Sequence, residues 1–130
     1  MRQMAVWIDR DEARLFTVTE EAFDETTVRS PLHHVHRHPK SQETRTHNHP
    51  QDELRFFGDV LAGLEGAEEI LIVGPSVTKL HLLRHLQHHA PAVAARVVGL
   101  ETADHPSDRQ LVAHVRHYFH SDRPRQGLGS

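Results

Sequence analysis

The sequence predicts a single α/β domain built on a mixed five-stranded sheet, with the element order β-β-β-α-β-α-β-α. Three observations lead to this fold class. Short β-branched runs separated by a charged turn fill the first 30 residues, hydrophobic residues recur at helical spacing from residue 50, and each later helical segment follows a continuous apolar run. A chain of 130 residues has room for about one domain.

The N-terminal runs at residues 4–8 and 13–18 are rich in β-forming residues, and the charged segment 9–12 separates them. This pattern predicts an antiparallel hairpin. A third run near residues 26–29 extends the hairpin to a three-stranded meander, which Pro31 ends because proline cannot donate to a ladder.

The segment from Pro50 predicts the first helix, with Gly66 as its stop. Its apolar residues recur three or four positions apart: Leu54, Phe57, Leu61 and Leu64. The run 69–74 is continuously apolar after its first residue, as expected of a strand that is buried on both faces of a parallel sheet.

A second helix follows and ends near Pro91, and we expect its core side to be formed by Val77, Leu80, Leu83 and Leu86. The run 95–100 is the last strand. The third helix follows the segment 104–106, and its buried side is expected to hold Leu111, Val115, Tyr118 and Phe119. The domain therefore spans residues 1–120, and the tail 121–130 is expected to be disordered.

A hairpin followed by right-handed crossovers gives a mixed sheet with helices packed on it. The strand order 3-2-1-4-5, which is the ribonuclease H-like arrangement, satisfies these rules. Sequence patterns alone do not select it uniquely.

The composition excludes several classes of site. The chain has no cysteine, so it has no disulfide framework, thiolate zinc site, iron–sulfur cluster or cysteine nucleophile. Its longest strongly apolar run, residues 70–73, is far shorter than the roughly 20 residues that span a bilayer, and the N-terminus lacks a signal-peptide pattern. We therefore expect a cytoplasmic protein with no membrane partner.

The segment 29–50 differs from the rest of the chain, because it holds four basic residues against Glu43 alone and six of the 14 histidines. Arg37, Lys40 and Arg45 are candidates for phosphate contacts, and imidazoles such as His47 and His49 can stack on bases. The alternative is a disordered polar loop at about residues 30–50, bounded by prolines.

The same histidines suggest a metal site, because His36 and His38 form one close pair and His47 and His49 form another. Two such pairs could hold zinc, although H-x-H spacing is much less specific for zinc than paired C-x-x-C motifs. We expect no cofactor. The histidines at positions 81, 85 and 88 fall opposite the leucines of the second helix, which is typical of a solvated face.

The turn after residues 69–74 is a candidate anion site. Gly74 allows a sharp turn, Ser76 is a suitable N-cap, and Lys79 adds charge to the exposed amides of the first helical turn. The spacing is not that of a nucleotide P-loop. The alternative is an ordinary capped helix with a solvated lysine.

A metal-dependent nuclease would need several converging carboxylates. Asp9 ends the first strand and Asp104 or Asp108 begins the third helix, but Gly74 and Pro75 stand where a further carboxylate is needed. These acids are equally typical of turns and helix starts. No G-x-S-x-G elbow is present to anchor a hydrolase triad.

The segment Glu69–Leu86, EILIVGPSVTKLHLLRHL, resembles the strand, Gly-Pro turn and amphipathic helix of the middle domain of archaeal and eukaryotic peptide-chain release factors and of Pelota. Together with residues 6–9 (VWID), 29–31 (RSP) and 97–106 (VVGLETADHP), it is similar to a small bacterial family usually labelled translational machinery protein. The resemblance covers nearly all of the chain except the tail. It implies the ribonuclease H-like fold of the translational machinery component superfamily.

In the release factors this middle domain carries a Gly-Gly-Gln triplet on the loop before its first long helix, and this chain has no such triplet. The resemblance therefore implies an RNA-binding or ribosome-associated module of translation, with ribosomal or transfer RNA as partner, that is not a peptidyl-tRNA hydrolase and is more plausibly no enzyme. Zinc binding by His36, His38, His47 and His49 is the alternative, and a metal-dependent nuclease ranks last. The oligomeric state is not set by the sequence.

Overall fold

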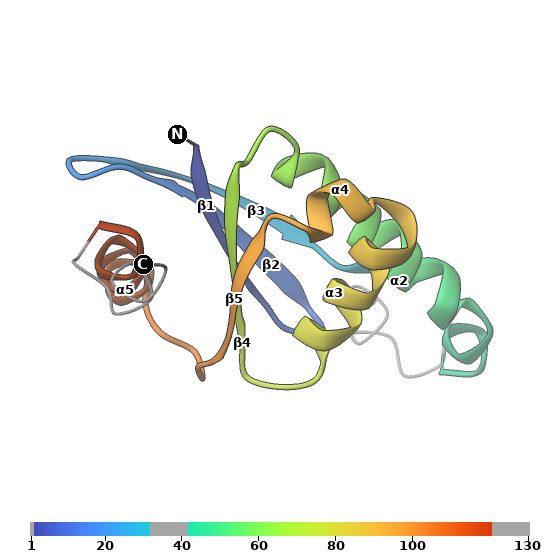
Figure 1. Cartoon of the computed structure of the whole chain (residues 1–130). Coiled ribbons are helices and arrows are strands. Elements are labelled where there is room, and N and C mark those ends of the chain that lie inside the picture. Colours follow the sequence, from blue (N-terminus) through green and yellow to red (C-terminus); the bar gives the residue numbers. More distant parts are fainter. Residues whose placement is uncertain (1, 32–41, 121–130) are drawn as a thin grey trace.

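The computed structural model describes residues 2–31 and 42–120, and within residues 42–50 it describes the backbone alone. Five strands and four helices are assigned in these ranges (Figure 1). In chain order they are β1 (Gln3–Ile8), β2 (Glu12–Val18), β3 (Phe23–Arg29), α2 (Gln42–Leu64), β4 (Glu69–Gly74), α3 (Thr78–His89), α4 (Pro91–Ala94), β5 (Val97–Thr102) and α5 (Asp108–His120).

The strands form one sheet of order β3-β2-β1-β4-β5, as predicted. The first three strands pair antiparallel, whereas β4 is parallel to both β1 and β5. Val6 of β1 lies opposite Leu15 on one side and Ile72 on the other. The mixed sheet and its order confirm the predicted fold class, a single ribonuclease H-like α/β domain.

The sheet separates two hydrophobic cores (Figure 1). Alternate residues of β1 point to opposite faces, so Val6 and Ile8 pack with α2, α3 and α4, whereas Ala5 and Trp7 pack with α5. β1 and β4 are each buried along five consecutive residues, which is why their sequences read as continuous apolar runs.

Helix α2 begins at Gln42, whereas the sequence predicted its start at Pro50. Residues 42–50 contain no large apolar side chain, so hydrophobic periodicity could not find this part of the helix. The segment predicted as a loop over residues 30–50 is therefore helical from residue 42. Phe57 and Leu64 are buried as predicted, and Phe56 and Val60 are buried beside them, whereas Leu54 is 51% exposed, so the core side of α2 does not include Leu54.

The core side of α3 also differs from the prediction. Leu82 and Leu86 are fully buried, whereas Val77 and Leu80 are 57% and 46% exposed. Apolar residues occur on more than one side of this helix, so periodicity did not define the buried face.

Smaller differences concern the C-terminal third of the chain. The short helix α4 was not predicted, and it delays the start of β5 to Val97. In α5, Val112 is buried, whereas Tyr118 is only partly buried and its hydroxyl donates to the carbonyl of Val98. The tail 121–130, predicted to be disordered, lies outside the described residues. Within the described parts, no helix has the length and apolar character needed to cross a membrane.

Candidate functional site

The carboxyl ends of β1, β4 and β5 meet at one edge of the sheet, where the sequence placed its candidate acids and its anion-binding turn. Gly74 ends β4, and a Cβ atom built there would lie 2.3 Å from the carbonyl oxygen of Ile8. Only glycine allows this approach without a shift of backbone. The amide of Ala103 donates to the carbonyl of Gly74 at 3.1 Å, which joins the end of β5 to the same point.

The carboxylate of Asp9 serves the turn between β1 and β2. Its Oδ1 accepts the backbone amides of Asp11 at 2.9 Å and Glu12 at 3.0 Å. Its Oδ2 lies 3.2 Å from Nε2 of His105, whose Nδ1 lies 3.0 Å from Oδ1 of Asp104. The hydrogen bond with Asp104, followed by the one with Asp9, raises the pKa of the exposed His105 imidazole.

Trp7 is the centre of this arrangement and is fully buried. Its indole Nε1 donates to the carbonyl of Asp104 at 2.8 Å, and its ring centroid lies 4.9 Å from that of His105. The guanidinium of Arg14 lies 4.5 Å from the indole centroid and pairs with the carboxylate of Asp108 at 2.5 Å. We call these residues, together with Asp9, the Trp7 cluster. It fastens the β5–α5 connection to the sheet.

These contacts give the candidate nuclease acids structural partners. Asp9 binds backbone amides and Asp108 pairs with Arg14, whereas the side chain of Asp104 is 94% exposed. Within residues 2–31 and 51–120, no three histidine or acidic side chains are arranged to hold a metal ion. The geometry therefore does not favour metal-dependent phosphodiester cleavage at this edge.

The predicted N-cap role of Ser76 is wrong. The N-cap residue of α3 is Val77, whose backbone is helical, and no side chain caps the helix. Lys79 is not solvated: it is 8% exposed, and its Nζ donates to the carbonyl of Ser76 at 2.8 Å. The ammonium therefore closes the turn after β4, and phosphate binding by these two residues remains a prediction.

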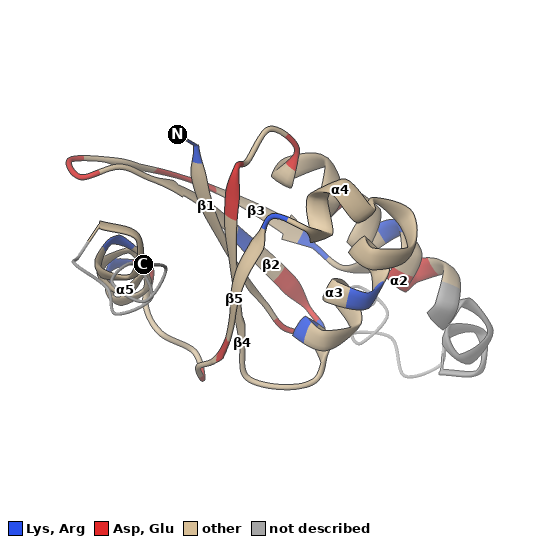
Figure 2. Cartoon of the chain, viewed as in Figure 1, with Lys and Arg blue, Asp and Glu red and all other residues tan. Residues whose placement is uncertain are grey.

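Helix α3 itself carries no carboxylate, although Oε2 of Glu53 on α2 lies 3.6 Å from Nδ1 of its His81. Residues 70–100 contain no aspartate or glutamate in a chain of net charge −3. The same stretch holds two arginines, a lysine and four histidines: Arg84, Arg96, Lys79, His81, His85, His88 and His89. Figure 2 shows α3 with basic residues and no acidic ones, whereas acidic residues mark the tip of the β2–β3 hairpin at the opposite end of the molecule.

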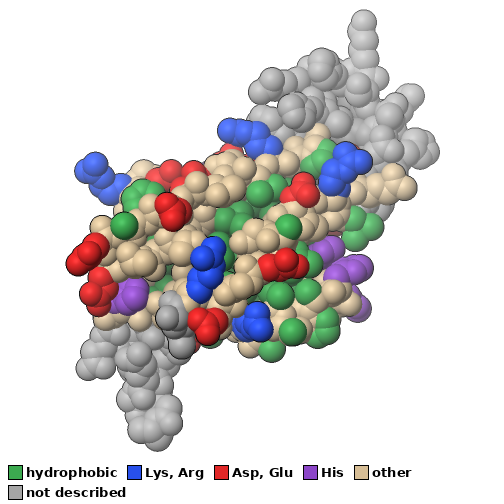
Figure 3. Space-filling view, turned by 90° about the horizontal axis from the view of Figure 1, so that it is seen from above, with side chains coloured by type: hydrophobic (Ala, Val, Ile, Leu, Met, Phe, Trp, Pro, Cys, Tyr) green, Lys and Arg blue, Asp and Glu red, His purple; other side chains and the backbone are tan. Residues whose placement is uncertain are grey.

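Exposed hydrophobic side chains adjoin this surface. Leu54, Val77 and Leu80 are among the five large hydrophobic side chains that are exposed in the described part of the chain. In Figure 3 histidine side chains lie beside hydrophobic ones at the α2–α3 end of the molecule. Between the two helices runs a groove with a cavity volume of about 290 Å³, lined by Glu53, Leu54, Phe57, His81, Arg84 and His85. We call it the α2–α3 groove.

The prediction of a solvated histidine face fails for His85. Its ring centroid lies 5.5 Å from that of Phe57 and 4.3 Å from that of His89. Burial, followed by the neighbouring His89, lowers the pKa of the His85 imidazole, and Glu53 partly opposes this shift. His85 is therefore neutral at pH 7, with a flat ring beside the groove. The groove was missed because Leu54, which lines it, had been assigned to the core.

The basic segment is only partly within the described structure. Arg37, Lys40, His36 and His38 lie outside the described residues, and so do the side chains of Arg45, His47 and His49. The backbone at positions 45, 47 and 49 belongs to the first part of α2. Figure 1 shows the backbone of this part of α2 at the same end of the molecule as α3.

No protein-family model and no curated protein matches this chain. Solved structures do match. Pelota from Archaeoglobus fulgidus has a TM-score of 0.64 at 16% identity, over 91% of this chain and 31% of that one. Pelota from Thermoplasma acidophilum has a TM-score of 0.62 at 18% identity, over 92% and 33%. The archaeal translation termination factor aRF1 has a TM-score of 0.53 at 10% identity, over 98% and 38%.

At these identities the similarity shows the fold. The chain spans about a third of the length of each of these three proteins, so it corresponds to one domain of larger molecules. This agrees with the resemblance to release factors and Pelota on which the sequence expectation was based.

Proposed function

We propose that this chain is an RNA-binding, ribosome-associated module of translation that does not hydrolyse peptidyl-tRNA. The observation that carries the proposal is the set of basic side chains on α3, a helix without acidic residues, on a fold shared with Pelota and with a translation termination factor. Ribosomal or transfer RNA is the proposed partner, and the cytoplasm is the proposed location.

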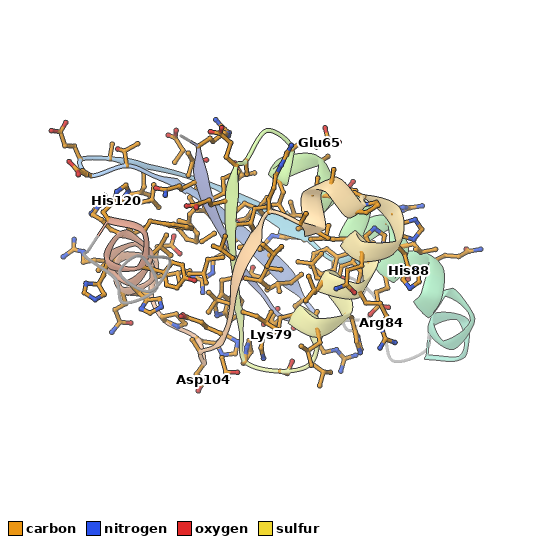
Figure 4. The ribbon with its side chains drawn as sticks, viewed as in Figure 1. Glu65, Lys79, Arg84, His88, Asp104 and His120 are labelled. Atoms are coloured by element: carbon orange, nitrogen blue, oxygen red, sulfur yellow. The ribbon has the colours of Figure 1, made fainter. Side chains whose placement is uncertain are left out.

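Electrostatics favour a localised contact. The chain is acidic overall, so its whole surface does not attract a polyanion. Arg84 and His88, both labelled on α3 in Figure 4, lie at the end of the molecule opposite His120. At this end an RNA backbone can approach α3 without meeting the acidic β2–β3 hairpin.

Two features support a role other than peptidyl-tRNA hydrolysis. The sequence lacks the Gly-Gly-Gln triplet that this activity uses in release factors. The acids at the carboxyl edge of the sheet, Asp9 and Asp108, are bonded to neighbouring groups of the protein in the Trp7 cluster. These carboxylates therefore serve structural contacts rather than contacts with a substrate. Binding is therefore the function that the surface supports best.

The test is a titration of structured RNA across a salt series, starting at about 50 mM, because each neutralised phosphate steepens the fall of affinity with salt. We expect binding that weakens as salt rises, and a further loss when Arg37, Lys40 and Arg45 are replaced together by alanine. An exposed arginine on α5, Arg109, provides the matched control, because Arg109→Gln removes one charge from a different surface. Absence of binding at low salt, or affinity unchanged in the triple variant, would count against the proposal.

A further inference from the structure

We infer that the α2–α3 groove holds one unpaired RNA nucleotide, with its base against Leu54 and the His85 ring and its phosphate at Arg84. We also infer that it prefers bases whose exocyclic amino group can reach Glu53. This inference rests on the proposed function, since it assigns the RNA-binding surface a base-selective site.

The walls of the groove suit a flat, partly apolar ligand. Leu54 is 51% exposed, and Phe57 closes the base of the groove from α2. At about 290 Å³ the cavity is at the lower limit of small-molecule sites, so it matches a single base better than a nucleic-acid helix. Covering Leu54 with a base removes apolar surface from water.

The imidazole of His85 supplies the second wall. Contact with Phe57 and His89 fixes its ring, and burial keeps it neutral at pH 7. Single-stranded RNA is commonly bound by stacking bases on such rings, and stacking tolerates any base because each has a π-face. Stacking thus supplies affinity but no selectivity.

Selectivity comes from the charges that line the groove. Glu53 is its one carboxylate, and Oε2 lies 3.6 Å from Nδ1 of His81, which is longer than a hydrogen bond. This places Glu53 within ion-pair distance of His81 when that imidazole is protonated, and Arg84 lines the same groove. Because α3 has no acid, a phosphate is drawn to Arg84, and Glu53 is left to accept from the base.

Adenine and cytosine carry an exocyclic amine that donates to a carboxylate, whereas uracil presents a carbonyl oxygen in the corresponding place. The groove therefore distinguishes bases by whether the polar group that faces Glu53 is a hydrogen-bond donor or an acceptor. A metal ion is a poorer occupant, because the described histidine and acidic side chains form no group arranged to hold one.

The experiment titrates the full chain with oligo(A), oligo(C) and oligo(U) of equal length at about 50 mM salt, where phosphate contacts contribute equally to all three. We expect oligo(A) and oligo(C) to bind about tenfold more tightly than oligo(U), since a hydrogen bond to a charged acceptor is among the stronger ones. Glu53→Gln should bring the three within about twofold, because an amide both donates and accepts. Glu65→Gln, a change directly after the C-terminal end of α2 (Figure 4), should leave the preference intact.

A second pair of variants tests the apolar wall. Leu54→Ser should weaken all three oligonucleotides by about fivefold through lost stacking area. Leu100→Ser removes a leucine that is 38% exposed on β5 and should have no effect. Leu54 is about half exposed and Leu100 is 38% exposed, and a thermal melt of each variant verifies that it still folds.

Titration of ¹⁵N-labelled protein with AMP and UMP measures nucleotide binding in the groove independently of RNA binding. Amide shifts around Leu54 and His85 that are larger with AMP support the inference even if structured RNA does not bind, a result that would reject the proposed function alone. Structured RNA that binds with no base preference and no effect of Leu54→Ser would overturn the inference while the proposed function stands. Equal or absent shifts with both nucleotides would overturn it as well.

Discussion

Replacing Gly74 by alanine tests the backbone geometry on which the carboxyl edge of the sheet depends. The added Cβ would lie 2.3 Å from the carbonyl oxygen of Ile8, against at least 3.4 Å for an ordinary contact, so the ends of β1 and β4 must separate by about 1 Å. β1 is paired on both sides, with β2 and β4, and cannot move without lengthening ladder hydrogen bonds.

Overpacking of this kind costs about 1–3 kcal/mol. Gly74 does not have a positive φ, so the alanine adds no backbone strain and recovers about 0.5 kcal/mol by restricting the unfolded chain. We expect the free energy of unfolding of Gly74→Ala to fall by about 2 kcal/mol, which lowers Tm by roughly 8 °C in a domain of this size.

Urea denaturation followed by the fluorescence of Trp7 measures this change, because Trp7 is the single tryptophan and is fully buried. The matched control is Gly58→Ala in α2, where a Cβ meets nothing within 4 Å. A helix interior favours alanine, so this control should be stabilised by about 0.5–1 kcal/mol. A Gly74→Ala variant as stable as the wild type would refute the close approach of the two strand ends.

Three further predictions concern the candidate sites. The raised pKa of His105 means that its contribution to stability is fully present below the unfolded pKa of about 6.5 and is lost as pH rises through the folded value. The Tm advantage of wild type over His105→Asn should therefore shrink between about pH 6 and pH 8. A constant difference in Tm would contradict the pairing of His105 with Asp9 and Asp104. Lys79→Met removes the bond from the ammonium to the carbonyl of Ser76 and should cost about 1 kcal/mol in urea denaturation. Weaker RNA binding by this variant would support the predicted phosphate contact, whereas unchanged affinity would contradict it. If the histidines of residues 33–49 hold no structural zinc, chelation should leave the Tm of untagged protein unchanged, whereas a fall with stoichiometric zinc release would support the alternative function.

The central strands were predictable because β1 and β4 are buried on both faces, and an unbroken apolar run records that burial directly in the sequence. The observed strand order satisfies the connection rules, but the sequence pattern did not select it uniquely. The hairpin followed from the charged turn at residues 9–12, and Asp9 does bind the turn amides. Local patterns were sufficient where local contacts decide the structure.

The helix faces were not predictable to the same degree. Leu54 and Leu80 fit a helical period as well as Phe56 and Leu82 do, and packing against the sheet decides between them. The first part of α2 left no apolar signal at all. The wall of the α2–α3 groove formed by Leu54 was misassigned for this reason.

The Trp7 cluster could not be derived from spacing, since Trp7 and Asp104 are 97 residues apart in the chain. The histidine surplus was visible at once, but the different environments of the histidines in the basic segment, α3, the Trp7 cluster and α5 depend on tertiary contacts. His85 and His105 show the consequence, because their different surroundings lower the pKa of His85 and raise the pKa of His105.

Co-sedimentation of the chain with ribosomes tests the central claim most directly. The comparison is between wild type, a double variant with Arg84→Gln and His88→Gln, and the control Arg109→Gln, at about 50 mM salt and again at about 200 mM. We predict that wild type and control sediment with ribosomes at low salt, that high salt releases them, and that the double variant stays largely in the supernatant. Wild type that remains in the supernatant at low salt, or a double variant that sediments as well as the control, would contradict an RNA-binding role for the α3 surface.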